Sequence, residues 1–360
     1  MRPALALLTI AAFLPGAAPA APAPLLAEEQ VAIAVHDAAI GSVVQVDVDW
    51  QAKDGSASPE FEQFFGKIMP VQSPRPPHRD HVAGTGVVWD AAGHVVAMIE
   101  MAGKTDARIA LTFSDGSRRS ARLVGTDRAL NVSVLQIDGA PSGLHPITLG
   151  SSAGLRVGQQ VFALGSAWGR GIVMMQGMLG ATSADFDNTG RTSLLVNSPV
   201  NPGNTGGPVL DTSGQVIGLI QGMYTNNGYA GLAMAMPSDT LAWVVPRLIA
   251  DGRVARGQLG LTIVDSKRDS DQAALPEGLP GGVAVATVSA GGPAERAGLR
   301  ARAGDAVDVI TGIDGSPVRG FPDLRAVLDR LRPGQTCTLT VWRAGKTISV
   351  PVTLGAEKAD

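Results

Sequence analysis

The turn Asn201–Pro208, which reads Asn-Pro-Gly-Asn-Thr-Gly-Gly-Pro, constrains this chain more than any other stretch. Its glycines allow positive φ angles and let the backbone approach another chain closely. An apolar run that begins at Val209 follows the turn directly and is typical of a β-strand. The sequence therefore predicts a glycine-rich turn at which the backbone can approach another chain closely.

Composition narrows the class of protein that carries this loop. With 360 residues the chain is long enough for two or three domains, and its 45 glycines, 24 prolines and short valine-rich runs favour a β-rich protein. A net charge of −3 gives no indication of a nucleic-acid or acidic-membrane partner. Cys337 is the only cysteine, so no disulfide forms within the chain. Its place in an alternating run predicts a small, buried, apolar side chain.

The N-terminus is similar to an export signal. Arg2 supplies a positive charge, Ala4–Leu14 is a short apolar core, and Ala18–Ala20 suits cleavage after a small residue. We therefore expect residues 1–20 to be a signal peptide. The alternative is an uncleaved anchor, although the apolar run is too short to span a bilayer. No other stretch approaches the length of a membrane span, so we expect an exported protein without a stable span.

We expect an N-terminal segment at residues 21–40, which is weakly helical at Ala27–Ala39. A domain of short strands is expected to follow at residues 41–252. The strands end at Gly or Asp turn signals with no helix between them, which favours β-barrels over a parallel sheet. Ser238–Ile249 is expected to be a closing helix, because apolar residues repeat there at helical spacing. The expected strands are Gly41–Asp49, Gly84–Trp89, Gly93–Ile99, Ala107–Phe113, Arg119–Asp127, Val132–Ile137, Gln160–Gly165, Gly171–Ala181, Thr192–Val196 and Gln215–Gly222.

Residues 253–356 show a different order of expected strands and helices and are expected to form a second domain. An apolar–Gly–apolar strand start at Gln258–Leu261 leaves free N–H groups near the edge of a groove. Such a nest holds the C-terminal carboxylate of a peptide that adds a strand to the sheet. The groove would lie between Leu261–Asp265 and an amphipathic helix at Pro322–Leu331. The alternative is a domain that only packs on its neighbour. The predicted peptide-binding residues are Leu259, Gly260, Leu261, Leu324, Val327 and Leu328.

Several motifs follow one another in a characteristic order, namely Phe61–Gly66, Gly84–Val88, Phe113–Gly116, Val124–Asp127, Val157–Gly165, Asn201–Pro208 and Ala233–Ser238. Together they resemble the HtrA (DegP/DegS-type) family of trypsin-like serine proteases with one PDZ domain. The resemblance implies a mainly β fold: a trypsin-like double β-barrel followed by a PDZ domain, which is a small, partly open α+β barrel. It also implies a periplasmic protein that forms homotrimers, or oligomers mixed with an active paralogue, through the Phe61–Phe65 loop.

All three positions of the family's catalytic triad differ in this chain. The general-base histidine of the family stands seven residues after Gly93, where this chain has Glu100. The orienting aspartate stands four residues after the Val-Gly-Thr-Asp motif, where this chain has Asn131. The nucleophilic serine is replaced by Thr205. The substitutions therefore fall on the residues that would move protons.

The loop itself is expected to keep an oxyanion hole, formed by Gly203, Asn204 and Thr205. An unperturbed carboxylate such as that of Glu100 is a weak base toward an alcohol, and Asn131 cannot stabilise a cationic base. The methyl group of Thr205 also restricts its χ1 angle. Losing the nucleophile or the base of a comparable triad costs on the order of 10⁶ in kcat. Proteolysis is therefore not expected from this site.

We interpret the chain as an HtrA-like exported pseudoprotease that binds unfolded polypeptides or protein C-termini, as a chaperone, adaptor or regulatory subunit. One alternative is a weak endopeptidase that uses Thr205 with Glu100. Another is a structural assembly subunit without a peptide ligand. His78 and His81 stand in or beside a Pro-rich loop without a cysteine or carboxylate cluster, so we expect no metal and no cofactor. Tyr224–Leu232 is expected to be a loop beside the cleft.

Overall fold

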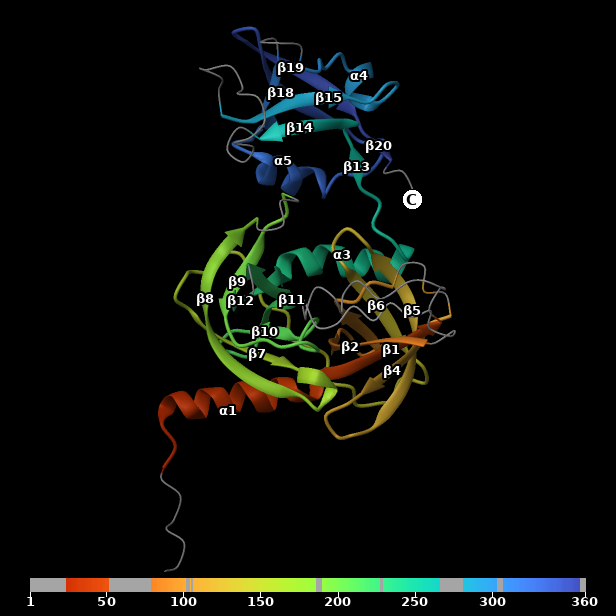
Figure 1. Ribbon diagram of the computed structural model, residues 1–360, viewed down its shortest axis with the longest axis vertical. Helices are drawn as coiled ribbons and strands as arrows, with labels where there is room; N and C mark the ends of the chain where they lie inside the picture. The colour runs from red at the N-terminus through yellow and green to blue at the C-terminus, as the bar shows by residue number, and fades with distance from the viewer. Residues whose placement is uncertain are drawn as a thin grey trace, which may run out of the picture.

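The computed structural model describes residues 24–51, 79–101, 104, 106–185, 190–226, 229–265, 281–302 and 307–356. The expected signal segment at residues 1–20 and the Phe61–Phe65 loop lie outside the described residues. In the described part, two closed β-barrels lie side by side and a smaller C-terminal domain follows them (Figure 1). The expectation of a mainly β double barrel followed by an α+β domain is confirmed.

The first barrel forms because its strands alternate apolar and polar residues and bury one face inside. Its strands are β1 (Val43–Gln51), β2 (Arg79–Val88), β3 (His94–Ala97), β4 (Arg108–Thr112), β5 (Arg118–Asp127) and β6 (Val132–Ile137). They close in the order β1-β2-β3-β6-β5-β4. Both faces of β1 are buried, since Val44 and Val46 lie inside the barrel and Val43 and Asp47, on the other face, are only 1% and 8% exposed. That face turns toward the second barrel, whose strand β7 (Gln160–Gly165) it contacts.

The second barrel closes in the order β10-β11-β12-β9-β8-β7. Its other strands are β8 (Val173–Ala184), β9 (Ser193–Asn197), β10 (Pro208–Leu210), β11 (Val216–Asn226) and β12 (Tyr229–Pro237). The expectation of a loop at Tyr224–Leu232 is wrong, because β11 continues to Asn226 and Tyr224 pairs with Leu232 across the hairpin. Glycine and asparagine residues in this stretch are typical of turns, but pairing with the barrel outweighs their weak local preference.

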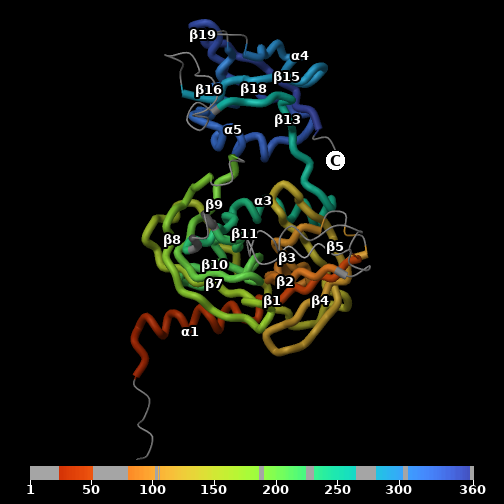
Figure 2. Tube along the Cα trace, viewed as in Figure 1, coloured from red at the N-terminus to blue at the C-terminus, as the bar shows by residue number. Residues whose placement is uncertain are grey.

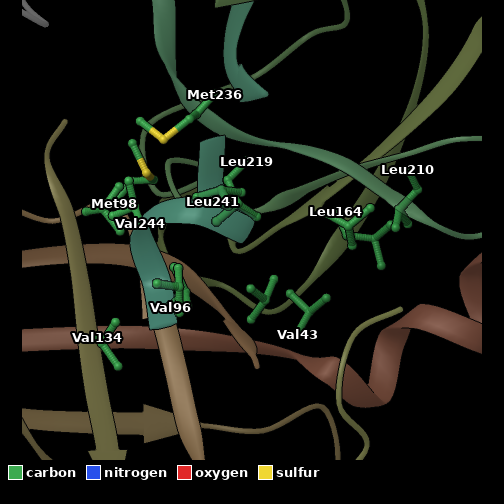
Figure 3. Packing of buried hydrophobic residues seen from close by; sticks show 14 of the residues in the cluster. Val43, Val96, Met98, Val134, Leu164, Leu210, Leu219, Met236, Leu241 and Val244 are labelled. Atoms are coloured by element: carbon green, nitrogen blue, oxygen red, sulfur yellow. The ribbon is translucent and has the colours of Figure 1, made fainter. Parts of the chain in front are cut away.

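One apolar cluster joins the two barrels to helix α3 (Ser238–Asp251). Figure 3 shows Val43 and Val96 of the first barrel and Leu219 of the second around Leu241 of this helix. The predicted helix at Ser238–Ile249 is confirmed and runs two residues further. It ends at Gly252, whose φ of 70° is a left-handed cap conformation that glycine adopts without strain. Burial of its apolar stripe holds the helix across both barrels.

The N-terminal helix α1 (Ala27–Ala39) has the predicted bounds and is joined to β1 by the 3-10 turn η1 (Ile40–Ser42). It extends away from the barrels (Figure 2), with Val35 and Ala39 at its inner end buried against the shared cluster. A second 3-10 turn, η2 (Ala167–Gly169), follows β7.

The C-terminal domain is built around a sheet ordered β14-β15-β16-β18-β19. Its elements are β13 (Gly257–Gln258), β14 (Leu261–Asp265), β15 (Val283–Val288), α4 (Pro293–Arg296), β16 (Asp308–Ile313), β17 (Ser316–Pro317), α5 (Phe321–Leu328), β18 (Thr336–Arg343), β19 (Lys346–Thr353) and β20 (Gly355–Ala356). Helix α5 ends at Leu328, three residues before the predicted Leu331. Cys337 is fully buried in this domain, as predicted.

Helix α5 lies on the side of the C-terminal domain that faces the barrels (Figure 1). A Cβ atom on Gly190, between β8 and β9, would stand 2.8 Å from the ring of Phe321 at the start of this helix. The helix that was expected to border the peptide groove therefore also forms the contact between the domains.

Candidate functional site

The turn Asn201–Pro208 is held against the first barrel by its backbone. Thr85 N donates to Thr205 O at 2.8 Å, and Gly206 N donates to Ile220 O at 2.7 Å. A Cβ atom on Gly206, where φ is 88°, would collide with the carbonyl oxygen of Thr85. Glycine is thus required where the turn meets β2.

Two N–H groups of this turn are available to a ligand. Those of Gly203, with φ at 94°, and of Thr205 have no acceptor among the described residues. Asn204 contributes differently, because its N–H donates to Asn201 O at 3.0 Å and its Oδ1 accepts from Asn201 N at 2.7 Å. Asn204 is fully buried and braces the turn, while the two free donors flank it.

Glu100 and Asn131 lie near one another at the same edge of the first barrel. Strands β3 and β6 are antiparallel with Ala97 opposite Ser133, so Glu100 follows one strand end and Asn131 precedes the other. Ser133 Oγ donates to Ile99 O at 2.8 Å and ties the two ends together. The Asn201–Pro208 turn meets this edge, since a Cβ on Gly206 would stand 3.0 Å from Met98 N. The structure therefore brings Glu100, Asn131 and the turn that carries Thr205 to one edge of the first barrel.

The hydrogen bonds of a proton relay are not made between these three residues. Thr205 has no side-chain hydrogen bond among the described residues, and none joins Asn131 to Glu100. Asn131 adopts a φ of 53°, and its Oδ1 is buried without a partner. The ammonium group of Lys104 donates to Glu100 O and lies 4.4 Å from the centre of the Trp50 ring. The site thus presents two backbone N–H donors, and no hydrogen bond among the described residues joins the Thr205 hydroxyl to a base.

Leu259 and Gly260, two of the residues expected to form a carboxylate nest, stand just before β14, and Leu261 is paired with Val288 within it. Gly260 has a φ of 70°, and neither its N–H nor that of Leu259 has an acceptor among the described residues. Their carbonyl groups are occupied, since Leu259 O accepts from Ala294 N at 2.8 Å and Gly260 O accepts from Ser289 N at 2.9 Å. These bonds hold the two free donors in place.

The predicted groove residues divide between core and surface. Leu259, Leu324 and Leu328 belong to the core of the C-terminal domain, at 4%, 1% and 9% exposure. Leu261 and Val327 are partly exposed and pack against that core. Three of the predicted groove residues are therefore core residues, while the other two and Gly260 are partly exposed.

Sequence patterns missed the ionic contacts at the domain junction. Arg191 binds Asp329, just past α5, through two bonds of 2.8 and 3.2 Å. Arg256 binds both carboxylate oxygens of Asp127, and both residues are almost fully buried. The partners are 138 and 129 residues apart in the chain, so no local pattern indicates them.

No group of three or more His, Cys, Asp or Glu residues that could hold a metal ion occurs within the described ranges. In the part of the chain that the structure describes, no helix is long and apolar enough to cross a membrane.

Two family models match the chain. The trypsin-like peptidase domain matches residues 84–219, and the PDZ domain matches residues 257–354. The first match includes the Asn201–Pro208 turn, and the second begins at β13 and ends just before β20. The two matches thus correspond to the barrels and to the C-terminal domain.

Relatives of this chain carry names of periplasmic proteases. The probable periplasmic serine endoprotease DegP-like of Chlamydia muridarum is 34% identical over 305 residues, which cover 82% of this chain and 58% of the relative. The protein of the same name from Pseudomonas putida strain W619 is 33% identical over 310 residues, covering 84% of this chain and 62% of the relative. The chain thus spans about three fifths of the length of these relatives.

A solved structure agrees over both domains. A variant of the HtrA-type protease AlgW with a decapeptide superposes with a TM-score of 0.72 at 26% identity, covering 91% of this chain and 97% of that chain. The expected trypsin-like double barrel followed by one PDZ domain is confirmed by this similarity together with the two family matches.

Proposed function

The chain belongs to the HtrA-type proteins, in which a trypsin-like peptidase domain precedes one PDZ domain, and on this premise we propose that it is an exported pseudoprotease. It holds unfolded segments or protein C-termini without cutting them. In this role it acts as a chaperone, adaptor or regulatory subunit in the quality control of envelope proteins. The periplasmic names of its relatives support the location.

One observation carries the proposal that catalysis is lost. No hydrogen bond links Thr205 to Glu100, or Glu100 to Asn131, among the described residues. A hydroxyl of ordinary pKa becomes a nucleophile only when an adjacent base takes its proton, and that base needs an orienting partner. Asn131 carries no charge to stabilise a protonated base. The Thr205 hydroxyl therefore keeps its proton.

Binding a polypeptide requires hydrogen-bond donors but no group that transfers a proton. The free N–H groups of Gly203 and Thr205 can donate hydrogen bonds to a peptide carbonyl oxygen in the cleft. In the PDZ domain, the free N–H groups of Leu259 and Gly260 suit a terminal carboxylate. The AlgW structure with a decapeptide supports peptide recognition by proteins of this architecture. Both sites support a protein that holds polypeptides.

The first test compares the full-length protein with Thr205→Ala. Both proteins are incubated with unfolded casein and with a fluorophosphonate probe that labels activated hydroxyl groups. We expect neither cleavage nor labelling above background, and equal casein binding by the two proteins. Cleavage or labelling that disappears in Thr205→Ala would establish the weak endopeptidase instead. Absence of polypeptide binding would favour the structural assembly subunit.

A second arm restores the triad with Glu100→His, Asn131→Asp and Thr205→Ser together. Proteolysis of casein should then rise by several orders of magnitude over the unchanged protein, because the scaffold that positions the triad is retained. The matched control carries only the first two substitutions and should stay far less active. A folded but silent triple variant would contradict an intact cleft.

We also propose that the protein assembles as a homotrimer or as a mixed oligomer with an active paralogue. This proposal rests on the resemblance to the family. Light scattering of the purified protein, alone and with the paralogue, measures the assembly directly.

A further inference from the structure

A chain of hydrogen bonds runs from the turn Asn201–Pro208 to a cavity that has no part in the proposed function. Thr85 Oγ1 donates to Gly203 O at 2.6 Å and accepts from Ser166 N at 2.9 Å. Ser166 Oγ donates to Gln45 Oε1 at 2.9 Å. Gln45 Nε2 in turn donates to both carboxylate oxygens of Asp47, at 3.1 and 3.0 Å. The turn that would receive a carbonyl group is therefore tied to the carboxylate of Asp47.

Asp47 lines a cavity of about 550 Å³ between the two barrels. The first barrel contributes Gln45 and Asp47 from β1 and the turn after β4. The second barrel contributes Gly169, Gly171 and Ile172, which connect β7 to β8. The lining combines polar groups of Gln45, Asp47 and Ser114 with apolar surface of Phe113 and Ile172. It therefore suits a long side chain with an apolar stem and a charged end.

Arg118 and Asp47 are the charged residues that line the cavity, and Asp47 is the buried one of the two. Only 8% of the residue is exposed, so solvent ions screen its carboxylate poorly. Its two cationic neighbours contact it at longer range: His81 Nε2 at 3.4 Å and Arg118 Nη2 at 3.7 Å. Their side chains are 50% and 66% exposed. Exposed pairs of this kind contribute little, so an entering cation displaces them easily and binds Asp47 directly.

The cavity lies within reach of a polypeptide held in the cleft. Thr85 N binds Thr205 O, and Ala83, two residues earlier on β2, stands opposite Asp47 on β1. Two residues of an extended strand span about 7 Å. The bound polypeptide would place one of its carbonyl groups at the turn. A long side chain two or three residues away from that carbonyl group covers the separation. An acidic side chain would be repelled by Asp47, and a short one would not reach it.

We propose that this cavity is a subsite for a lysine or arginine side chain of the bound polypeptide, with Asp47 as its counter-charge. Basic unfolded segments are then the preferred ligands of the cleft. This inference rests on the proposed function, since it assumes that a polypeptide lies in the cleft.

The test measures binding of labelled, flexible peptides by fluorescence anisotropy. The peptides are acetylated and amidated at their ends, so that the carboxylate nest has nothing to hold, and they differ only in one lysine or glutamine. The intact protein should bind the lysine peptide about tenfold or more tightly, as expected for a hydrogen bond between charged groups. Asp47→Asn should abolish this difference, so that the variant binds the lysine and glutamine peptides equally.

Two further variants separate the cavity from general effects. Asp115→Asn removes the same charge from an exposed turn beside the cavity and should keep the lysine preference. Ser114→Trp fills the cavity from its rim with Asp47 in place, and it should lose the preference even where Asp47→Asn does not fold. Equal binding of both peptides by the intact protein, or a preference that survives Ser114→Trp, overturns the subsite alone. Failure to bind either peptide overturns the proposed cleft function as well.

Discussion

Cys337 shows how its surroundings set the chemistry of a single residue. Its place between two threonines in an alternating run predicted a small buried side chain, and the structure buries it completely in β18. Burial, together with the nearby charge of Asp314, raises the pKa of the Cys337 thiol from 9.0 to about 11. The thiolate is the reactive form, so the folded protein should hold this thiol inert.

We expect alkylation of Cys337 by iodoacetamide near pH 8 to be negligible in the folded protein and complete after unfolding in guanidinium chloride. Mass spectrometry of the intact chain measures the label. Because the folded state raises the pKa, the thiol's contribution to stability is fully present below about pH 9 and is lost as the pH rises toward 11. Labelling of the folded and unfolded chains at similar rates would contradict this assignment.

The segment that leads into β14 shows how neighbouring segments fix the hydrogen-bond donors of a predicted site. An apolar–Gly–apolar pattern predicted the nest, but its function depends on how two other segments bond to it. Ala294 and Ser289 bind the carbonyl groups of Leu259 and Gly260, so that only the N–H groups remain for a ligand. The donors are therefore fixed before any peptide arrives, which lowers the entropy lost on binding.

The nest predicts that the PDZ domain distinguishes a free peptide terminus from an amidated one. A peptide with a free C-terminal carboxylate should bind the full-length protein about tenfold to a hundredfold more tightly than its C-terminal amide, because hydrogen bonds to a charged acceptor are strong. Isothermal titration calorimetry with the two peptides measures the difference. Indistinguishable affinities would show that the nest does not hold a carboxylate.

The prediction of secondary structure failed at the hairpin between β11 and β12. Alternating apolar residues identified most strands, because one buried face is a local property of the sequence. The stretch Tyr224–Leu232 was expected to be a loop, since its glycines and asparagines suit turns, yet it pairs as β11 and β12. Neighbouring strands of the closed barrel supplied partners that no local pattern reveals.

At the scale of the whole molecule, charged residues connect the two domains. Arg256, in the linker between α3 and β13, binds Asp127 of β5 and lies 3.5 Å from Asp329 beyond α5. Arg191 binds Asp329 from the opposite side. The linker is therefore bound by ionic contacts to the first barrel and to the C-terminal domain.

Arg256→Ala should lower the free energy of unfolding by about 3–5 kcal/mol, because it leaves the carboxylate of Asp127, a residue only 3% exposed, without its partner. Urea denaturation followed by tryptophan fluorescence measures the loss. Arg247→Ala is the matched control, since Arg247 stacks on Trp243 at 4.3 Å from the ring centre but neutralises no buried carboxylate. Its cost should stay near 1 kcal/mol.

A double-mutant cycle with Asp127→Ala completes this test. The cost of removing both partners should be clearly smaller than the sum of the two single costs, because no charge is then left buried alone. Additive costs would show that the two side chains do not interact in solution.

The resemblance to the HtrA family supplied the three positions at which a catalytic triad was expected. Local chemistry in the sequence was enough to predict the two-part β architecture and the glycine turn. Each depends on residues close together in the chain, through alternation, backbone freedom or the identity of one side chain. Folding was needed to place Thr205, Glu100 and Asn131 at one edge without a relay between them, to bury Asp47 in a cavity between the barrels, and to join Arg191 to Asp329. These contacts connect distant segments, and their energies depend on burial and on distance, which exist only once the chain is packed.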